Sequence, residues 1–251
     1  MFLKCILIGV ATGLLGAGAV ASEAKFCQKP LRVALLQKKH PYAAEFTFSK
    51  GVCLFQATKK TSKIHNKYLR WVSSRTITSP EYLMNKQRQI FYNHGLATAV
   101  FDSILSGVVG QLRPATEIEL SLFNLHFERV GGVNKYSEYA FYLFKNVRSD
   151  LVTVYFLSNN EPYIPAVESV SALLKQKISE GEELLMHYHF HPFNFVNPEG
   201  DIAGTLGPSL PDLRHYMRLP GLKTASITNG IDTMDFSPRD IQMLYKIGSD
   251  L

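Results

Sequence analysis

The C-terminal two thirds of the chain contain short runs in which apolar and polar residues alternate. Residues 117–130 alternate in this way up to a pair of glycines, and 138–144 and 151–157 are two further strand-like runs, separated by a polar segment. Alternation with a period of two is typical of strands that bury one face. We therefore predict strands over these three ranges.

Residues 165–181 follow a different period. Their apolar positions recur every three or four residues and the run ends in glycine, which predicts a helix. The next run, 184–190, is again strand-like. We also predict a short helix over 212–218, which a Pro-Gly pair ends, and a strand over 224–229.

The N-terminal third carries further elements. Residues 31–36, 46–56 and 67–73 have the character of strands. Residues 79–92 begin with Ser-Pro, which favours a helix start because serine caps the first turn and proline suits the first helical position. The apolar range 96–109 has helical spacing and predicts a buried helix.

Helices interleaved with mostly adjacent strands predict an α/β protein in which a mixed β-sheet is covered by helices. The chain has 251 residues, of which 46% are hydrophobic and 19% charged, and these values are ordinary for a globular protein and do not indicate disorder. The length allows one large or two small domains. We divide the chain into an N-terminal leader, a basic N-terminal region over 22–90 and a second domain over 91–251.

Residues 1–21 resemble a secretory signal peptide. Lys4 supplies a basic start, residues 5–15 are apolar, and Ala19-Val20-Ala21 is a small-residue cleavage signature. A membrane anchor is the alternative, but the apolar run is short for a bilayer span. We expect a mature protein that is periplasmic or secreted and has no transmembrane span after signal cleavage.

The mature chain would retain two cysteines, Cys27 and Cys53. In an oxidising compartment an even pair is most simply a disulfide, here one that closes the N-terminal segment. The alternative is a reactive thiol, which requires a neighbouring group that lowers the thiol pKa. Because spacing alone does not provide such a group, we predict a disulfide between Cys27 and Cys53.

Charge divides the mature chain unevenly. Residues 22–90 hold 14 Lys/Arg and 3 Glu, a net charge of +11, whereas 91–251 hold 12 Lys/Arg and 18 Asp/Glu, a net charge of −6. A basic face of this kind suits an anionic partner in the cell envelope, although scattered lysines are usually a solvated surface. No aromatic-basic signature accompanies it, so we expect no nucleic-acid partner.

The stretch 186–192 carries the strongest chemical signal. His187, His189 and His191 are three of the eight histidines in the chain, and their alternate positions place them on one face of the predicted strand. Pro192 then ends the strand because it has no N–H to donate. Two such imidazoles can bind one metal ion. A carboxylate from the next element would complete three protein ligands and leave a position for water, as in catalytic zinc sites.

A glutamate, a helix, a strand that ends in His-x-His-Pro and then Ser-x-x-Asp form the signature of the JAMM/MPN-type zinc metallopeptidases. The chain resembles this family over roughly residues 96–235, with Glu138, His189-Phe190-His191-Pro192 and Ser209-Leu210-Pro211-Asp212 in the matching positions. The order of the predicted strands and helix around the motif is also similar.

This resemblance implies a zinc ion (Zn2+) held by His189, His191 and Asp212, with water as the fourth ligand. Glu138 would act as general base and later pass the proton to the departing amine. Ser209 would donate a hydrogen bond to the oxyanion of the tetrahedral intermediate. The implied activity of the second domain is therefore hydrolysis of a peptide or isopeptide bond.

Two parts of this assignment have alternatives. Ser209 and Asp212 also fit a capping box, in which the serine caps a helix and the aspartate lies in its first turn. Glu119 and Glu128, on the preceding predicted strand, are rivals of Glu138 for the role of base.

The segment 192–208 is longer than its counterpart in the family and contains turn residues, so it would suit a flap over the site. Glu199 and Asp201 within it are alternative carboxylate ligands. Two further histidines flank the motif. We expect His187 to pack, because the family usually has an aromatic residue there. For His215, one helical turn beyond Asp212, we favour capping of the helix end over the alternative of joining the metal ligands.

Other catalytic classes have less support. The chain lacks the Gly-x-Ser-x-Gly elbow of serine hydrolases, a His-Glu-x-x-His helix and the early His-x-x-x-Asp pair of cell-wall peptidases. We therefore expect an exported zinc metallopeptidase that acts on a peptide, a protein or a peptidoglycan peptide. The alternative is a catalytically inactive MPN-like scaffold or envelope-binding module, because a fold can persist without its chemistry.

Overall fold

The computed structural model describes residues 26–39, 41–49, 52–58, 61–93, 98–165, 168–196 and 204–249. The signal peptide predicted over 1–21 lies outside these residues. The strands are β1 (Arg32–Gln37), β2 (Tyr42–Ser49), β3 (Gln111–Arg113), β4 (Tyr139–Lys145), β5 (Leu151–Ser158), β6 (Glu183–Phe190), β7 (Thr224–Thr228) and β8 (Thr233–Phe236). The helices are η1 (Val52–Phe55, a 3-10 helix), α2 (Lys63–Ser73), α3 (Pro80–Asn93), α4 (Ala99–Leu105), α5 (Glu117–Arg129), α6 (Glu168–Ser179), α7 (Leu210–Met217) and α8 (Pro238–Ser249).

The strands form one sheet in the order β1-β2-β5-β4-β6-β7-β8-β3. All neighbouring pairs are antiparallel except β6 and β7, which are parallel. The prediction of a mixed sheet with helices is therefore confirmed. A parallel pair needs a crossover connection, and α7 lies in the connection from β6 to β7. The start of α7 consequently comes back toward the C-terminal end of β6.

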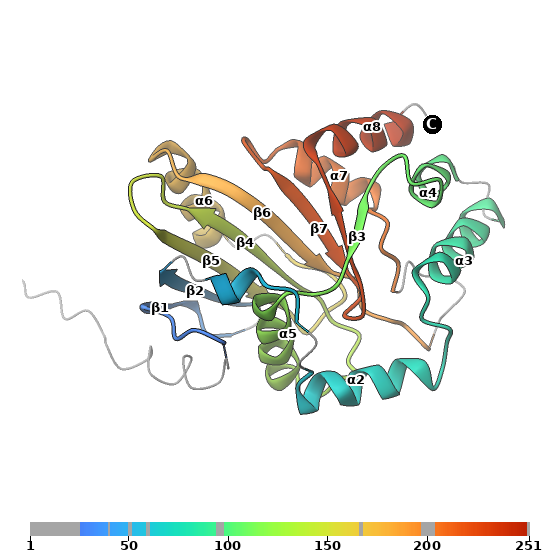
Figure 1. Ribbon diagram of the computed structural model, residues 1–251, viewed down its shortest axis with the longest axis horizontal. Helices are drawn as coiled ribbons and strands as arrows, with labels where there is room; N and C mark the ends of the chain where they lie inside the picture. The colour runs from blue at the N-terminus through green and yellow to red at the C-terminus, as the bar shows by residue number, and fades with distance from the viewer. Residues whose placement is uncertain are drawn as a thin grey trace, which may run out of the picture.

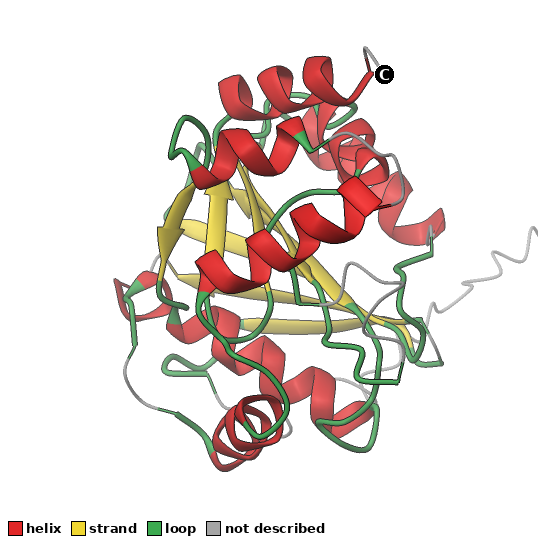
Figure 2. Ribbon diagram, turned by 90° about the vertical axis from the view of Figure 1, so that its right-hand side faces the viewer, coloured by secondary structure: helices red, strands yellow, loops and turns green. Residues whose placement is uncertain are grey.

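The two faces of the sheet pack against different helices, as Figures 1 and 2 show. On the first face, α2 and α5 cover an aromatic core that includes Tyr139 and Phe141 of β4 and Tyr188 and Phe190 of β6. On the second face, α4, α6, α7 and α8 cover another core, to which β4 contributes Tyr142. Successive strand residues point to opposite faces, which gives each strand one side chain in two for each core.

A bulge in β6 sets which of its residues reach the second face. The register of β6 with β4 shifts by one residue between Met186 and Leu184, so Leu185 is the extra residue. Leu185 and Met186 consequently both pack against the first core, although they are neighbours in the chain. The alternation resumes beyond the bulge and turns His187 and His189 toward the second face.

The basic N-terminal region 22–90 is built into the same sheet within the described residues. β1 pairs with β2, and β2 pairs with β5 along its whole length. Helix α2 packs on the first core. Cys27 and Cys53 form the predicted disulfide, which joins the segment before β1 to η1.

Two helices replace predicted strands. Residues 117–130 form α5, and the prediction was wrong because this helix is buried on nearly all sides, including polar positions that imitate alternation. Residues 67–73 belong to α2, where the buried His65, Tyr68 and Val72 follow helical spacing. None of the described helices has both the length and the apolar character that crossing a bilayer requires.

The other predicted elements lie close to observed ones. The strand predictions for β1, β4, β5, β6 and β7 and the helix predictions for α3, α6 and α7 are confirmed within a few residues. The strand predicted over 46–56 begins earlier, as β2, and its second half forms η1 instead. The helix predicted over 96–109 is the shorter α4 among the described residues.

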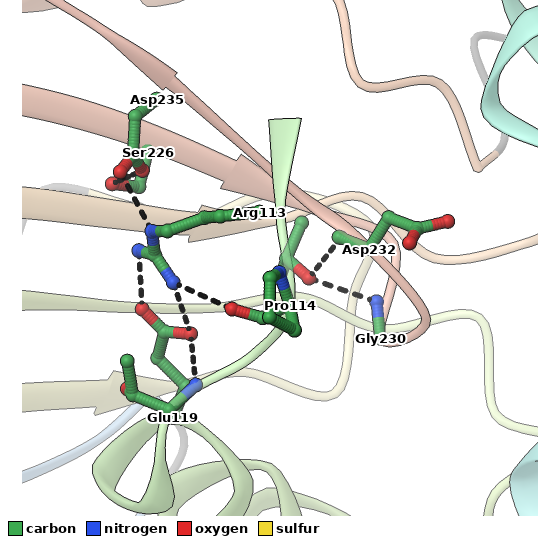
Figure 3. A network of polar contacts seen from close by, with 9 residues as sticks. Arg113, Pro114, Glu119, Ser226, Gly230, Asp232 and Asp235 are labelled. Atoms are coloured by element: carbon green, nitrogen blue, oxygen red, sulfur yellow. Dashed lines mark hydrogen bonds and ion pairs between the residues drawn. The ribbon is translucent and has the colours of Figure 1, made fainter. Parts of the chain in front are cut away.

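An ion network fastens the edge strand β3 to α5 and β8 (Figure 3). The guanidinium of Arg113 lies between two carboxylates, with Nη2 2.6 Å from Glu119 Oε1 and Nε 2.6 Å from Asp235 Oδ2. Ser226 Oγ donates to the other oxygen of Asp235 at 2.7 Å, and the Thr116 N–H donates to Glu119 Oε2 at 2.8 Å. The side chain of Glu119 is 1% exposed and is fully engaged in this network.

Candidate metal centre

Four side chains from distant parts of the chain meet where β6 ends. Glu138 directly precedes β4, His189 and His191 lie at the end of β6, and Asp212 lies in the first turn of α7. Ala140 of β4 pairs opposite His189, so Glu138 comes level with His191 in this antiparallel pair. The crossover to β7 brings the start of α7 to the same end of these strands.

The side chains of this group are in contact. His189 lies between two carboxylates, with Nε2 2.9 Å from Glu138 Oε2 and Nδ1 3.2 Å from Asp212 Oδ1. His191 Nε2 lies 3.6 Å from Asp212 Oδ2. One ligand atom each from His189, His191 and Asp212 lies within 4.8 Å of the others, so this group could hold a metal ion.

The electrostatics of the group favour a positive charge beside its carboxylates. Burial lowers the pKa of His189, but Asp212 and Glu138 outweigh burial and raise the pKa to about 10. Burial raises the pKa of Asp212, but the charge and hydrogen bonds of the histidines hold it well below its usual range. A metal ion at this position would take the place of a proton, because histidine ligands bind metals in their neutral form.

The segment after the histidine pair orients His191. The Nδ1–H of His191 donates to the Thr205 carbonyl at 3.1 Å, which leaves Nε2 as the nitrogen that faces Asp212. The Gly204 N–H donates to the Pro192 carbonyl at 3.0 Å, so these two residues lie next to each other. The role of Thr205 could not be predicted from the sequence, because every residue has a backbone carbonyl and no motif distinguishes this one.

Ser209 forms the capping box that was the alternative explanation of its motif, and it also lines the candidate site. Its N–H and Oγ donate to Asp212 Oδ2 at 2.8 and 2.6 Å, and the Asp212 N–H donates back to Ser209 Oγ at 3.3 Å. These bonds form the capping box of α7. The cap holds the Asp212 carboxylate toward the histidines, so the structural interpretation does not compete with a functional one.

A pocket of about 550 Å³ lies over this group. Strands β4, β5 and β6 form its floor, the first turns of α7 form one wall, and α6 with the loop before it forms the other. The residues of the predicted site all line this pocket: Glu138, His189, His191, Ser209 and Asp212. A volume of this size is usual for binding and active sites.

No family model matches this chain. Comparisons with curated proteins and with solved structures find no match either. The functional conclusion therefore rests on the geometry of the pocket and on the residue types that line it.

The rival carboxylates lie elsewhere. Glu119 is held by Arg113, and Glu128 is exposed on α5, which covers the opposite face of the sheet. Glu199 and Asp201 lie outside the described residues. Of the glutamates proposed as base, the structure thus brings Glu138 to the histidine pair.

Two further histidines extend along the pocket. His187 is 4% exposed and its ring contacts Tyr142, His215 and Tyr216, which agrees with the expected packing role, although its Nδ1 has no hydrogen-bond partner among the described residues. His215 lies in the last turn of α7, and its Nε2 lies 2.9 Å from the Tyr142 hydroxyl of β4. Burial lowers the pKa of both imidazoles. Strand alternation could have identified Tyr142, which shares the face of Ala140.

Proposed function

We propose that this protein is a zinc-dependent hydrolase that cleaves a peptide or isopeptide bond, in the manner implied by its resemblance to the JAMM/MPN-type metallopeptidases. One observation carries the proposal. Five residues that match the motif of that family, from three separate parts of the chain, line a single pocket: Glu138, His189, His191, Ser209 and Asp212. If each of these residues had a separate structural role, nothing would require all five to line the same pocket.

The donor set suits zinc. Two imidazole nitrogens and a carboxylate oxygen are usual ligands of catalytic zinc, which keeps a further position open. Two ligands that each lie ~2.1 Å from a tetrahedral ion are ~3.4 Å apart. The oxygens of Asp212 lie 3.2 Å from His189 Nδ1 and 3.6 Å from His191 Nε2, close to this separation. The Thr205 carbonyl supplies the outer hydrogen bond that usually orients a histidine ligand.

The residues around the ligands would carry out the proton transfers. Zinc in this site would supply a water molecule whose pKa is lowered toward ~7. Glu138, at the edge of the group, would accept a proton from water and deliver it to the departing amine. Ser209 would turn its hydroxyl from Asp212 to the developing oxyanion. No covalent link between enzyme and substrate is needed.

The proposed setting is the periplasm or the extracellular space, where the substrate would be a peptide, a protein or a peptidoglycan peptide. The Cys27–Cys53 disulfide supports an oxidising compartment. The basic region 22–90 would then be available to an anionic partner in the envelope.

Metal analysis of the purified protein and three variants tests the proposal. The wild-type protein should carry about one zinc ion per chain. His191→Ala should lose the zinc, whereas Glu138→Gln should keep it and cleave a mixture of blocked peptides roughly 10²- to 10⁴-fold more slowly, because only the base is lost. His215→Asn, which removes a pocket imidazole outside the ligand group, should retain the zinc.

Two outcomes would contradict parts of this assignment. An unchanged zinc content in His191→Ala would show that the ion binds elsewhere. A wild-type protein that carries stoichiometric zinc but yields no new peptide termini by mass spectrometry would favour the inactive scaffold instead.

A further inference from the structure

The pocket has an apolar half that the proposed chemistry does not use. Opposite α7, its wall consists of the loop 162–165 and of Val170 and Leu174 on α6, and Leu157 of β5 lies beneath them. Val170 and Leu174 are 2% and 8% exposed, so this wall is anchored in the second core. Tyr163 lines the same half and is 57% exposed. An exposed aromatic ring beside an apolar pocket is typical of a ligand-binding surface.

Between the two halves of the pocket, the floor is formed by the small side chain of Ala140. Ala140 pairs opposite His189 on one side and opposite Leu157 on the other, and it lines the pocket. Opposite residues in neighbouring strands have Cβ atoms ~5 Å apart. A group that fills the apolar half is therefore directly adjacent to the metal-binding half, and no large side chain of β4 stands between them.

The charge of the pocket excludes one kind of ligand. Glu138 and Asp212 are the carboxylates that line it, and no lysine or arginine does so among the described residues. In the apolar half, an acidic side chain of a substrate would leave water with no lysine or arginine of the described lining to pair with. Such an unpaired charge is a common means of rejecting a ligand.

We propose that the apolar half of the pocket binds a bulky, uncharged side chain of the size of leucine or phenylalanine, in the peptide residue next to the cleaved bond. This inference rests on the proposed function and deepens it. It selects a protein or neutral peptide as the substrate, in place of a peptidoglycan peptide that carries free carboxylates. The wall on α6 provides the preference for size, and the lack of a lysine or arginine in the described lining provides the rejection of acidic residues.

A series of blocked peptides of the form acetyl-Ala-Ala-X-Ala-Ala-amide, with X as Ala, Leu, Phe or Glu, tests the inference. The zinc-loaded Glu138→Gln variant reports binding by calorimetry, and the wild-type protein reports kcat/KM by mass spectrometry. The Leu and Phe peptides should bind about 10- to 100-fold more tightly than the Ala peptide, because each buries an apolar side chain. The Glu peptide should bind no more tightly than the Ala peptide.

Two neighbouring residues of α6 provide a matched pair of variants. Ser171 and Ala172 are both exposed, but only Ser171 lines the pocket. Ser171→Trp, in the Glu138→Gln background, should fill the apolar half and remove the preference for Leu and Phe. Ala172→Trp should leave the preference unchanged. Zinc content should be the same in both, since neither residue touches the ligand group.

The outcomes separate this inference from the proposed function. Selective binding of the Leu and Phe peptides without cleavage by the wild-type protein would retain the apolar site and refute the hydrolase. Cleavage with equal kcat/KM for the Ala, Leu and Glu peptides would retain the hydrolase and refute the apolar site. Failure of every peptide to bind, or a preference that survives Ser171→Trp, would also refute the apolar site.

Discussion

Two helices of this protein begin with the same Ser-x-x-Asp capping box, and only one of them is part of the candidate metal centre. In α7 the N–H and Oγ of Ser209 donate to Asp212 at 2.8 and 2.6 Å. In α8 the N–H and Oγ of Ser237 donate to Asp240, both at 2.9 Å. Each aspartate N–H donates back to its serine, at 3.3 and 3.2 Å. The local hydrogen bonds of the two boxes are nearly the same.

The surroundings of the two boxes differ. Asp212 lies against two imidazoles at the end of β6, whereas Asp240 belongs to no group that could hold a metal ion among the described residues. The difference arises from topology, because the crossover from β6 to β7 returns the start of α7 to the histidines. A capping box thus orients an aspartate, and its position in the fold decides whether that aspartate can become a ligand.

The largest expected effect separates the two aspartates. Under the proposed function, Asp212→Asn should reduce both the zinc content and peptide cleavage to background, because it removes the anionic member of the group that could hold the metal. Asp240→Asn should change neither. Both variants keep an oxygen that can accept the hydrogen bonds of the cap, so their helices should persist. Elemental analysis of the two variants measures their zinc contents. Equal zinc contents would show that the capping boxes of α7 and α8 do not differ in metal binding.

Loss of zinc through general destabilisation is tested by a strong perturbation away from the pocket. Arg113→Met leaves Glu119 buried without a cation and should lower the free energy of unfolding by about 3–5 kcal/mol. The folded protein should still bind zinc. The double variant with Glu119→Gln should recover part of the stability, because an uncharged glutamine can keep the capping box of α5. Urea unfolding and metal analysis measure both quantities. Zinc loss in folded Arg113→Met would make Asp212→Asn uninformative about ligation.

A smaller effect compares the two serines. Ser209→Ala and Ser237→Ala should each lower the free energy of unfolding by about 1 kcal/mol, because each loses a helix cap. Only Ser209→Ala should also slow cleavage, by roughly 10²- to 10³-fold if its hydroxyl stabilises the oxyanion. Denaturant titration and kcat of the zinc-loaded proteins give the two readings. An equal kcat in both variants would reduce Ser209 to a cap alone.

The sequence predicts most of the strands correctly, including the fully buried β4, but fails at a helix that lacks a polar side. In α5, Glu119, Ser121 and His126 are buried together with the apolar residues, so no polar stripe revealed the helix. The available signal was its capping box, in which Thr116 precedes Glu119 by three residues. Helix α8 was missed although it begins with Ser-Pro, the same start that identified α3.

The two strands at one edge of the sheet, β3 and β8, could not be predicted for another reason. The strands β3 and β8 have three and four residues, too few for a period to emerge. The order of the strands depends on pairing between residues far apart in the chain, which no local pattern contains.

The group that could hold a metal ion was predictable because its chemistry is concentrated in a few side chains. His189, His191 and Asp212 stand at recognisable spacings. The choice of Glu138 over Glu119 depends on which face of the sheet α5 covers, and this follows only from the packed structure. The Thr205 carbonyl likewise becomes relevant only when the chain after β6 folds back.

The bulge in β6 makes this strand unequally tolerant of changes in length. If Leu185 were removed, Leu184, Met186 and His187 would point to alternate faces of the sheet, as in a strand without a bulge. His187 and His189 would then stay on the side of α7. Adding one residue after Met186 would turn both imidazoles into the aromatic side of the sheet. The histidine cluster can therefore survive a deletion at this point but not an insertion.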